Sequence, residues 1–210
     1  MALAIDLVRQ QLGAIKLRER PRSAAPLRWC WAELSGRLAE LSSAGGEATL
    51  TWAMALVRDA QGEGETTAWV MTPQSTWYPP DVAANGIDLG ALIAVRVPDL
   101  PAVSRAADRL ARSGGFGLVV LDLGKQAAIP PALQSRLAQH ALRHQCTILC
   151  LTEKSDRVPS LGSLVSLHAR AGRKHPVEGR FSCTLTISKD KRNGPGWGQE
   201  ELCHGPPGLR

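Results

Sequence analysis

The sequence predicts an α/β fold: a mostly parallel sheet with helices on both faces and an antiparallel hairpin at one edge. Between Gly36 and Leu151, short apolar runs typical of buried strands alternate with segments whose apolar residues recur at helical spacing. After Pro159 the pattern changes to two stretches of alternating polar and apolar residues around a glycine-bearing turn. Strand–helix alternation builds a parallel sheet, and the two alternating strands add an antiparallel edge to it.

The elements follow in this order along the chain. The strands expected in the parallel part are Arg37–Leu41, Thr66–Thr72, Leu92–Val95, Phe116–Leu121 and Cys146–Leu151, and those of the hairpin are Ser163–Arg170 and Arg180–Ser188, joined by the turn Gly172–Gly179. One helix carries the apolar stripe Leu50, Ala53, Met54 and Val57, and the next carries Val103, Ala106, Ala107 and Leu110. The last helix, Pro130–His144, begins with proline, which is favoured in the first helical turn.

The two ends of the chain are expected to lie outside this core. Ile5, Val8, Leu12 and Ile15 follow helical spacing, and the basic, proline-bearing stretch Lys16–Pro26 that follows them has no periodicity. We therefore divide the chain into a helical arm with its linker (1–28), one domain (29–191) and a flexible tail (192–210) that is rich in glycine and proline. The arm either docks on another molecule or folds back on its own domain.

Charge is distributed unevenly along the 210 residues, whose net charge is +6. Six basic and two acidic side chains give residues 1–28 a charge of +4, and eight basic and four acidic give residues 170–210 the same charge. Basic ends of this kind suit nucleic acid or an acidic protein partner. No apolar run approaches the roughly 20 residues that span a bilayer, and no signal peptide is apparent, so we expect a cytoplasmic protein.

Neither a metal nor a disulfide framework is expected. The five cysteines are scattered and odd in number, which indicates reduced thiols. His140 and His144 lie four residues apart on one predicted helix, but no third ligand accompanies them. Trp29 and Trp31 precede the first strand and are expected to cover the core or to anchor an interface.

The turn after the first strand is where a parallel α/β fold would bind a phosphate. A phosphate-binding loop needs glycines, then a lysine that neutralises the phosphate and a hydroxyl that holds magnesium. Here Gly45 and Gly46 are followed by Glu47 at the lysine position and Ala48 at the hydroxyl position. A carboxylate at that point repels a triphosphate, so we expect no bound nucleotide and no cofactor.

Four short motifs carry a resemblance to a known family: Gly36–Leu41 before the glycine turn, Gly86–Leu89, Arg112–Gly114 leading to Leu118–Asp122, and Leu185–Lys191. In this order and spacing they resemble the core of the RecA recombinases, over residues 31–191. The degenerate glycine turn and the ending Lys189–Trp197 are most similar to the ImuA family, the RecA-like accessory proteins of mutagenic translesion synthesis. The chain also resembles, more weakly, the SulA group of division inhibitors.

The resemblance implies an ATP site that has lost its catalytic groups. Gln74 stands where the recombinases have the glutamate that orients the attacking water, although Asp122 stands at the position of the Walker B aspartate. The two loops that bind DNA in that family match the short segments 123–129 and 153–161, which leaves nucleic-acid binding open. We therefore expect a protein that is not an enzyme, and a working RecA-like ATPase is the disfavoured alternative.

The same resemblance implies partners. The lysines at the positions of Lys189 and Lys191 reach across the recombinase filament toward the ATP of the neighbouring subunit; alternatively, they protect an edge strand from aggregation. With the apolar stripe Ile5, Val8, Leu12 and Ile15, they are the candidate partner-binding residues. The implied function is a non-catalytic adaptor of the SOS response and translesion synthesis that binds RecA, inhibits its filaments and contacts ImuB-like polymerase proteins. A SulA-type inhibitor acting on FtsZ is the alternative.

Overall fold

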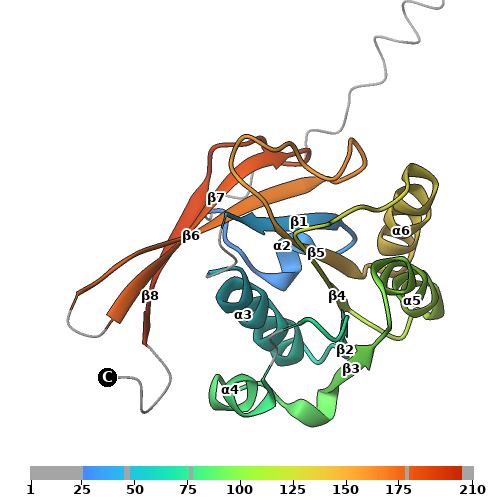
Figure 1. Ribbon diagram of the computed structural model, residues 1–210, viewed down its shortest axis with the longest axis horizontal. Helices are drawn as coiled ribbons and strands as arrows, with labels where there is room; N and C mark the ends of the chain where they lie inside the picture. The colour runs from blue at the N-terminus through green and yellow to red at the C-terminus, as the bar shows by residue number, and fades with distance from the viewer. Residues whose placement is uncertain (1–25, 45–47, 76–77, 178–179, 205–210) are drawn as a thin grey trace, which may run out of the picture.

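In a computed structural model of the chain, one mixed sheet of eight strands runs through the whole domain (Figure 1). The structure describes residues 26–44, 48–75, 78–177 and 180–204. The strand order is β3-β2-β4-β5-β1-β6-β7-β8, with β1 to β6 parallel to one another and β7 antiparallel to both β6 and β8. The predicted α/β fold with an antiparallel edge is confirmed.

The strands are β1 (Leu38–Ser43), β2 (Thr67–Met71), β3 (Leu92–Arg96), β4 (Leu118–Gly124), β5 (Thr147–Glu153), β6 (Leu167–Val177), β7 (Arg180–Asp190) and β8 (Gly198–His204). The helices are α2 (Trp31–Leu34), α3 (Thr49–Gly62), α4 (Pro79–Ala84), the short 3₁₀ turn η1 (Leu89–Ala91), α5 (Leu100–Ser113) and α6 (Pro131–His144). Each predicted strand and helix of the parallel part has a counterpart within a few residues, whereas α2, α4 and η1 were not predicted.

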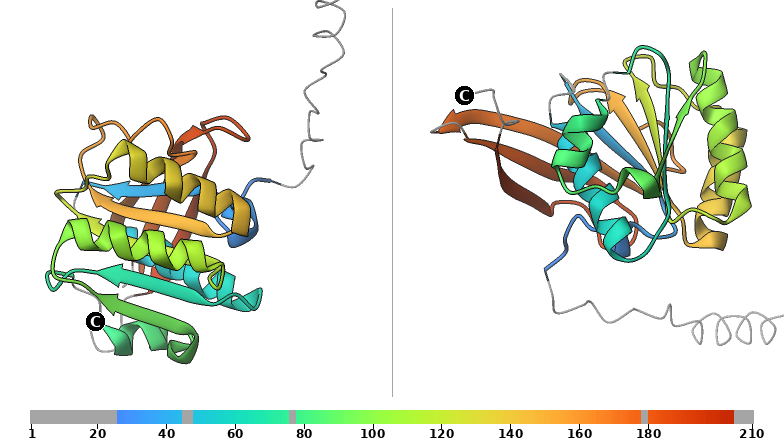
Figure 2. Two further views of the ribbon diagram at one scale, coloured as in Figure 1. Left: turned by 90° about the vertical axis from the view of Figure 1, so that its right-hand side faces the viewer. Right: turned by 90° about the horizontal axis from the view of Figure 1, so that it is seen from below.

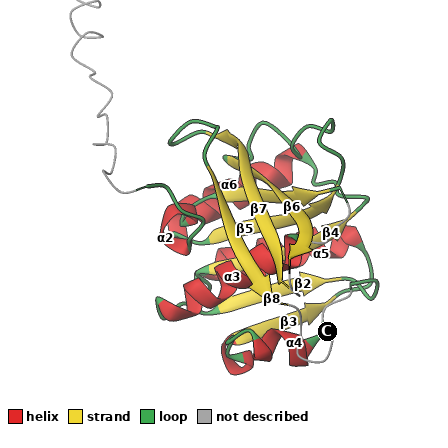
Figure 3. Cartoon of the chain, turned by 90° about the vertical axis from the view of Figure 1, so that its left-hand side faces the viewer, coloured by secondary structure: helices red, strands yellow, loops and turns green. Residues whose placement is uncertain are grey.

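Two helical layers enclose the sheet. On one face α5 and α6 lie side by side, and their residues Val103 and Leu137 pack with Ile148 of β5 (Figure 2). On the other face Trp52 and Leu56 of α3 pack against Trp69 and Leu185. The sheet is so strongly coiled that β6, β7 and β8 pass in front of α3 in Figure 3, and the indole of Trp52 donates a hydrogen bond to the Thr184 carbonyl (3.2 Å). The face that each helix buries follows the predicted apolar stripes.

Strand β1 lies at the centre and is buried along its entire length. It pairs in parallel with β5, Leu38 opposite Ile148, and with β6, Ala39 opposite Leu167. A strand with parallel neighbours on both sides and helices above and below reads as a continuous apolar run, and Leu38–Leu41 does so except at Glu40. No helix in the described ranges is long and apolar enough to cross a membrane.

The antiparallel region differs from the prediction in two ways. Strand β6 continues through residues 172–177, which were predicted to be the turn, and it begins four residues later than expected. Gly172 lies within the strand because the space beside it is filled: a Cβ there would come within 2.8 Å of the Thr184 hydroxyl oxygen. A glycine inside a strand therefore marked close packing here and not a turn.

The predicted flexible tail is wrong over Gly198–His204, which form β8. This segment has few apolar residues, so its periodicity gives no strand signal. It is held by backbone pairing with β7, from Thr186 opposite Gly198 to Arg180 opposite His204. Gly198 is required by this approach, since a Cβ there would lie 2.4 Å from the Leu185 carbonyl oxygen. The arm residues Ile5, Val8, Leu12 and Ile15 lie outside the described residues.

A buried ion pair joins the two halves of the fold. One Arg37 guanidinium nitrogen, just before β1, lies 2.6 Å from the carboxylate of Asp190 at the end of β7, and both side chains are almost fully buried. Asp190 also accepts hydrogen bonds from the Arg192 amide (2.8 Å) and the Trp197 indole (3.1 Å). Burial would raise the pKa of Asp190, but the bonds from Arg37 and Arg192 outweigh it and hold the pKa below its usual value.

We expect Asp190→Asn to lower the free energy of unfolding by about 3–5 kcal/mol, because it leaves the Arg37 charge buried without a counter-ion. The matched control is Asp156→Asn, since Asp156 pairs with Arg170 (2.8 Å) but its side chain is 84% exposed. That change should cost less than about 1 kcal/mol. Urea-induced unfolding measures both, and equal losses would contradict the structural role given to Asp190.

Candidate functional site

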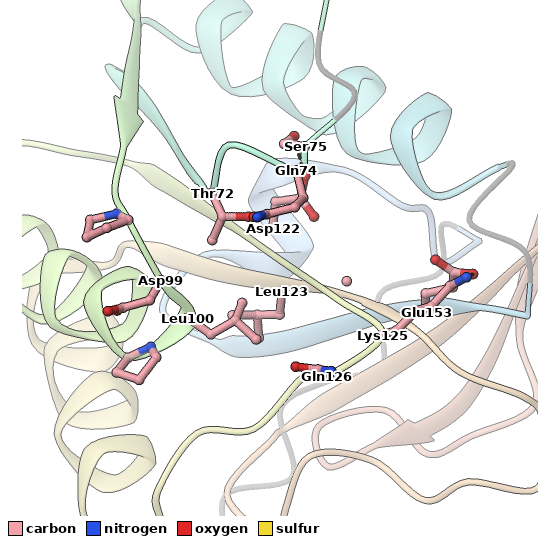
Figure 4. A pocket seen from close by; sticks show the side chains of 13 residues that line it. Thr72, Gln74, Ser75, Asp99, Leu100, Asp122, Leu123, Lys125, Gln126 and Glu153 are labelled. Carbon is pink, nitrogen blue, oxygen red and sulfur yellow. Dashed lines mark hydrogen bonds and ion pairs between the residues drawn. The ribbon is translucent and has the colours of Figure 1, made fainter.

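The carboxyl ends of β2, β3, β4 and β5 border a cleft with a volume of about 730 Å³ (Figure 4). In open parallel sheets this edge is where ligands bind. The residues that line it are Thr72, Gln74, Ser75, Pro98, Asp99, Leu100, Pro101, Asp122, Leu123, Gly124, Lys125, Gln126 and Glu153. The cleft therefore brings together Gln74 and Asp122, two of the predicted site residues.

The Asp122 carboxylate is held by a neighbour within the protein. It lies near the end of β4, partly buried, and accepts a hydrogen bond from the Ser75 hydroxyl (2.6 Å). Burial raises the pKa of Asp122, and the bond from Ser75 offsets only part of that effect. Gln74 is exposed beside it, and its amide has no proton-accepting nitrogen and cannot act as a general base. Within this pair, Asp122 is therefore the proton acceptor, and Gln74 can only donate or accept hydrogen bonds.

A second pair stands on the other side of the cleft. The Lys125 ammonium lies 3.3 Å from the Glu153 carboxylate, which joins the ends of β4 and β5. Figure 4 shows this pair across the cleft from Gln74, Ser75 and Asp122. Because Lys125 is engaged by a carboxylate at the surface, the only ammonium group among the lining residues is already partly neutralised.

The predicted phosphate-binding turn is described only in part. Gly45, Gly46 and Glu47 lie outside the described residues, and Ala48 caps the start of α3 without a side-chain hydrogen bond. The next residue, Thr49, is buried, and its hydroxyl donates to the Ser43 hydroxyl (2.9 Å). The Thr49 hydroxyl, which was not among the predicted site residues, thus bonds across the turn to the end of β1.

The structure does not bring Lys189 and Lys191 to this cleft. Lys189 is the last residue but one of β7 and Lys191 directly follows its end; because β7 is antiparallel to the other strands, both lie at the amino edge of the sheet. The Lys189 ammonium donates to the carbonyl of Gly162 (3.1 Å), and both burial and the charge of Lys191 lower the pKa of Lys189. Lys191 is exposed. The two lysines therefore differ: Lys189 holds the loop between β5 and β6 at Gly162, and Lys191 faces solvent.

Sequence reasoning missed a buried polar cluster beneath that loop. Glu40 is fully buried in β1; its carboxylate contacts the Lys154 ammonium and accepts bonds from the Thr152 hydroxyl (2.9 Å) and the Leu161 amide (2.7 Å). A glutamate inside an otherwise apolar strand was the available signal. The cluster ties the segment after β5, one of the two expected DNA-binding loops, to the sheet.

His168 extends this cluster between β1 and β7. Its Nε2 shares a hydrogen bond with the Ser42 hydroxyl (2.8 Å), and its Nδ1 shares one with the Ser188 hydroxyl (3.0 Å). Burial lowers the pKa of His168 to about 4; Glu40 opposes that effect, and the cations Lys154, Arg170 and Lys189 add to it. His168 is therefore neutral at physiological pH.

The remaining predicted features have structural explanations. Trp29 is a buried core residue whose indole donates to the Trp52 carbonyl (3.0 Å), and the Trp31 indole donates to the Gly117 carbonyl (2.9 Å). His140 lies 3.7 Å from Asp108. Within the described residues no group of three metal-ligating side chains occurs, and all five cysteines are free.

A family model described as the MT3502 N-terminal domain matches residues 34–157, which is more than half of the chain. The match spans β1 to β5 and every residue that lines the cleft, and it ends before β6, β7 and β8. A search of curated proteins finds no match to the chain.

We expect the stability of the protein to fall as the pH is lowered from about 6.5 to about 4. The unfolded state binds the proton of His168 at its ordinary pKa of 6.5 and the folded state only near 4, so acid favours unfolding. The full effect is on the order of 3 kcal/mol. His168→Gln keeps an amide that can bond to Ser42 but does not titrate. The difference in unfolding free energy between wild type and variant, measured by urea at several pH values, should shrink in acid; a constant difference would contradict this assignment.

Proposed function

We propose that this chain, which belongs to the MT3502 N-terminal domain family, is a non-catalytic, RecA-like adaptor in the DNA-damage response. It binds RecA, restrains RecA filaments and works with ImuB-like proteins of mutagenic translesion synthesis. The observation that carries the proposal is the chemistry at the carboxyl edge, where each group needed for nucleotide hydrolysis is replaced or engaged internally.

Three positions support the proposed absence of catalysis. Ala48 offers no hydroxyl to magnesium, Gln74 offers no base, and one oxygen of the Asp122 carboxylate is engaged by the Ser75 hydroxyl. Glu47 adds a negative charge where a triphosphate needs a positive one. Any one of these changes would weaken an ATPase, and together they support the proposed loss of nucleotide hydrolysis.

The choice of RecA as partner rests on the motifs that resemble the recombinase core and on the lysines that end β7. Lys191 is exposed and makes no ion pair with any residue that the structure describes, so we assign the direct contact with the terminal RecA subunit to it. Lys189 acts by holding the Gly162 carbonyl and thereby the loop beside the contact. A subunit that docks in this way and binds no nucleotide stops further growth of the filament.

We expect no binding of ATP. Isothermal calorimetry with ATP and magnesium should show no heat above dilution for the wild type. Glu47→Lys should not restore binding, because Ala48 still lacks the magnesium ligand, whereas Glu47→Lys combined with Ala48→Thr should give measurable affinity if the turn is otherwise intact. A dissociation constant in the micromolar range for the wild type would contradict the proposed loss of the site.

We expect substoichiometric amounts of the protein to inhibit the ATPase of RecA on single-stranded DNA. Lys191→Ala should weaken inhibition about tenfold or more, since a hydrogen bond to a charged group is worth about 1.5–3 kcal/mol. The matched control is Lys125→Ala, an exposed lysine at the opposite edge of the sheet, which should inhibit like the wild type. Equal inhibition by Lys191→Ala and wild type, or binding to FtsZ in place of RecA, would refute the proposal.

A further inference from the structure

The helical layer formed by α5 and α6 carries a strong positive charge that the charge count along the chain conceals. Residues 29–169 have a net charge of −2, yet the exposed surface of these two helices holds a set of arginines: Arg105, Arg109, Arg112, Arg136 and Arg143. The only acidic residue in either helix is Asp108, whose side chain is 17% exposed. The fold has therefore gathered cations on one face.

The arginines form two rows on adjacent helices. Arg105, Arg109 and Arg112 have the spacing i, i+4, i+7, which places them on one side of α5, opposite the buried Val103 and Ala107. Arg136 and Arg143 lie two turns apart on α6. Seven residues rise about 10 Å along a helix, and packed helices lie about 8–10 Å apart. Figure 2 shows α5 and α6 side by side as the outer layer.

Most of this charge is not neutralised within the protein. Arg136 lies 3.2 Å from Asp108, and Arg105 lies 3.9 Å from the exposed Asp99. Arg109, Arg112 and Arg143 make no ion pair with any of the residues that the structure describes. Guanidinium groups held in this manner on a rigid, packed scaffold are suited to oxyanions.

We propose that the α5–α6 face, defined by these five arginines, binds the phosphate backbone of duplex DNA. An acidic protein partner fits less well, because protein interfaces have an apolar, often aromatic centre, and Leu142 is the single large apolar side chain strongly exposed on the described part of these helices. A basic stripe along helices with no apolar centre is the electrostatic footprint of nucleic-acid binding.

Duplex fits better than single-stranded DNA. Proteins that hold single strands stack the bases on aromatic side chains, and α5 and α6 contain no Phe, Tyr or Trp. Outside its grooves a duplex presents the sugar–phosphate backbone, whose charged groups are the phosphates. Those grooves are roughly 6 Å and 12 Å wide, which is compatible with two rows of long arginine side chains about 8–10 Å apart. Contacts of this type are independent of sequence and depend steeply on salt.

This binding face is separate from the features on which the proposed function depends. The cleft lies at the carboxyl edge of the sheet and Lys191 at the amino edge beyond β6, whereas the arginines lie on the outer surface of a helical layer. Neither proposal requires the other, and substitutions on the α5–α6 face are expected to leave inhibition of RecA unchanged.

The test is fluorescence anisotropy of the full chain with a labelled 20-base-pair duplex at several salt concentrations. We expect Arg109→Ala combined with Arg112→Ala to weaken binding about tenfold or more at 0.1 M salt and to reduce the slope of log affinity against log salt by about 2. The matched control is Arg58→Ala combined with Arg96→Ala, two exposed arginines of α3 and β3 outside this face, which should change affinity less than about threefold. Both variants keep the basic ends of the chain.

Four results would overturn the proposal. They are equal losses in the two double variants, unchanged binding by the Arg109 and Arg112 variant, tighter binding of a single strand than of the duplex, and no duplex binding together with arginine-dependent binding of a polyglutamate peptide. The last result would assign the face to an acidic protein. Both variants replace exposed side chains that no described residue needs for an ion pair, so melting temperatures close to that of the wild type are expected.

Discussion

The buried contact between Arg37 and Asp190 is the interaction on which the arrangement of the sheet depends. It connects the start of the central strand to the end of β7, 153 residues later, and the same carboxylate organises the turn that leads into β8. Since a buried ion pair is strongly destabilising when one partner is missing, neither residue can be replaced alone without loss. Through this contact the antiparallel ribbon is fixed relative to the parallel sheet.

A second set of buried polar groups makes the loop after β5 part of the core. Glu40 binds the Leu161 amide and Lys154, Lys189 binds the Gly162 carbonyl, and neutral His168 lies between them. Burying these groups is tolerable only because nearly every one of them has a partner. Polar groups at the carboxyl edge and under this loop therefore have partners within the protein. The charged groups that make no ion pair with any described residue include Lys191 and arginines on the outer surface of α5 and α6.

The parts of the fold that the sequence predicted are those set by local pattern. Apolar runs such as Cys146–Leu151 and stripes such as Val103 to Leu110 identify their own strand and helix, because burial on one or both faces leaves a periodic signature. Strand β8 has no such signature, since backbone pairing with β7 holds it. Gly172 was wrongly assigned to a turn for the same reason. The side chain that fills the space beside it belongs to Thr184, and that neighbour is known only once the pairing of β6 with β7 is known.

The candidate site was predictable to a similar extent. Gln74 and Asp122 each end a predicted strand, so their meeting at one edge of the sheet follows from the alternation of strands and helices. Ser75 on Asp122, Thr49 on Ser43 and the Glu40 cluster depend on side-chain geometry between segments that are distant in sequence. The arginine rows were concealed because most of the acidic residues that balance them in a linear count belong to other segments of the chain.

The central place of β1 constrains how the chain is assembled during synthesis. β1 is made before its neighbours β5 and β6, which begin at Thr147 and Leu167, more than 100 residues later. Until the ribosome has delivered them, the six buried residues of β1 have no strand to pair with, and local helix formation by α3 cannot cover them alone. Folding of this domain is therefore dominated by contacts between segments that are distant in sequence, and it leaves apolar residues of β1 exposed until those segments are made.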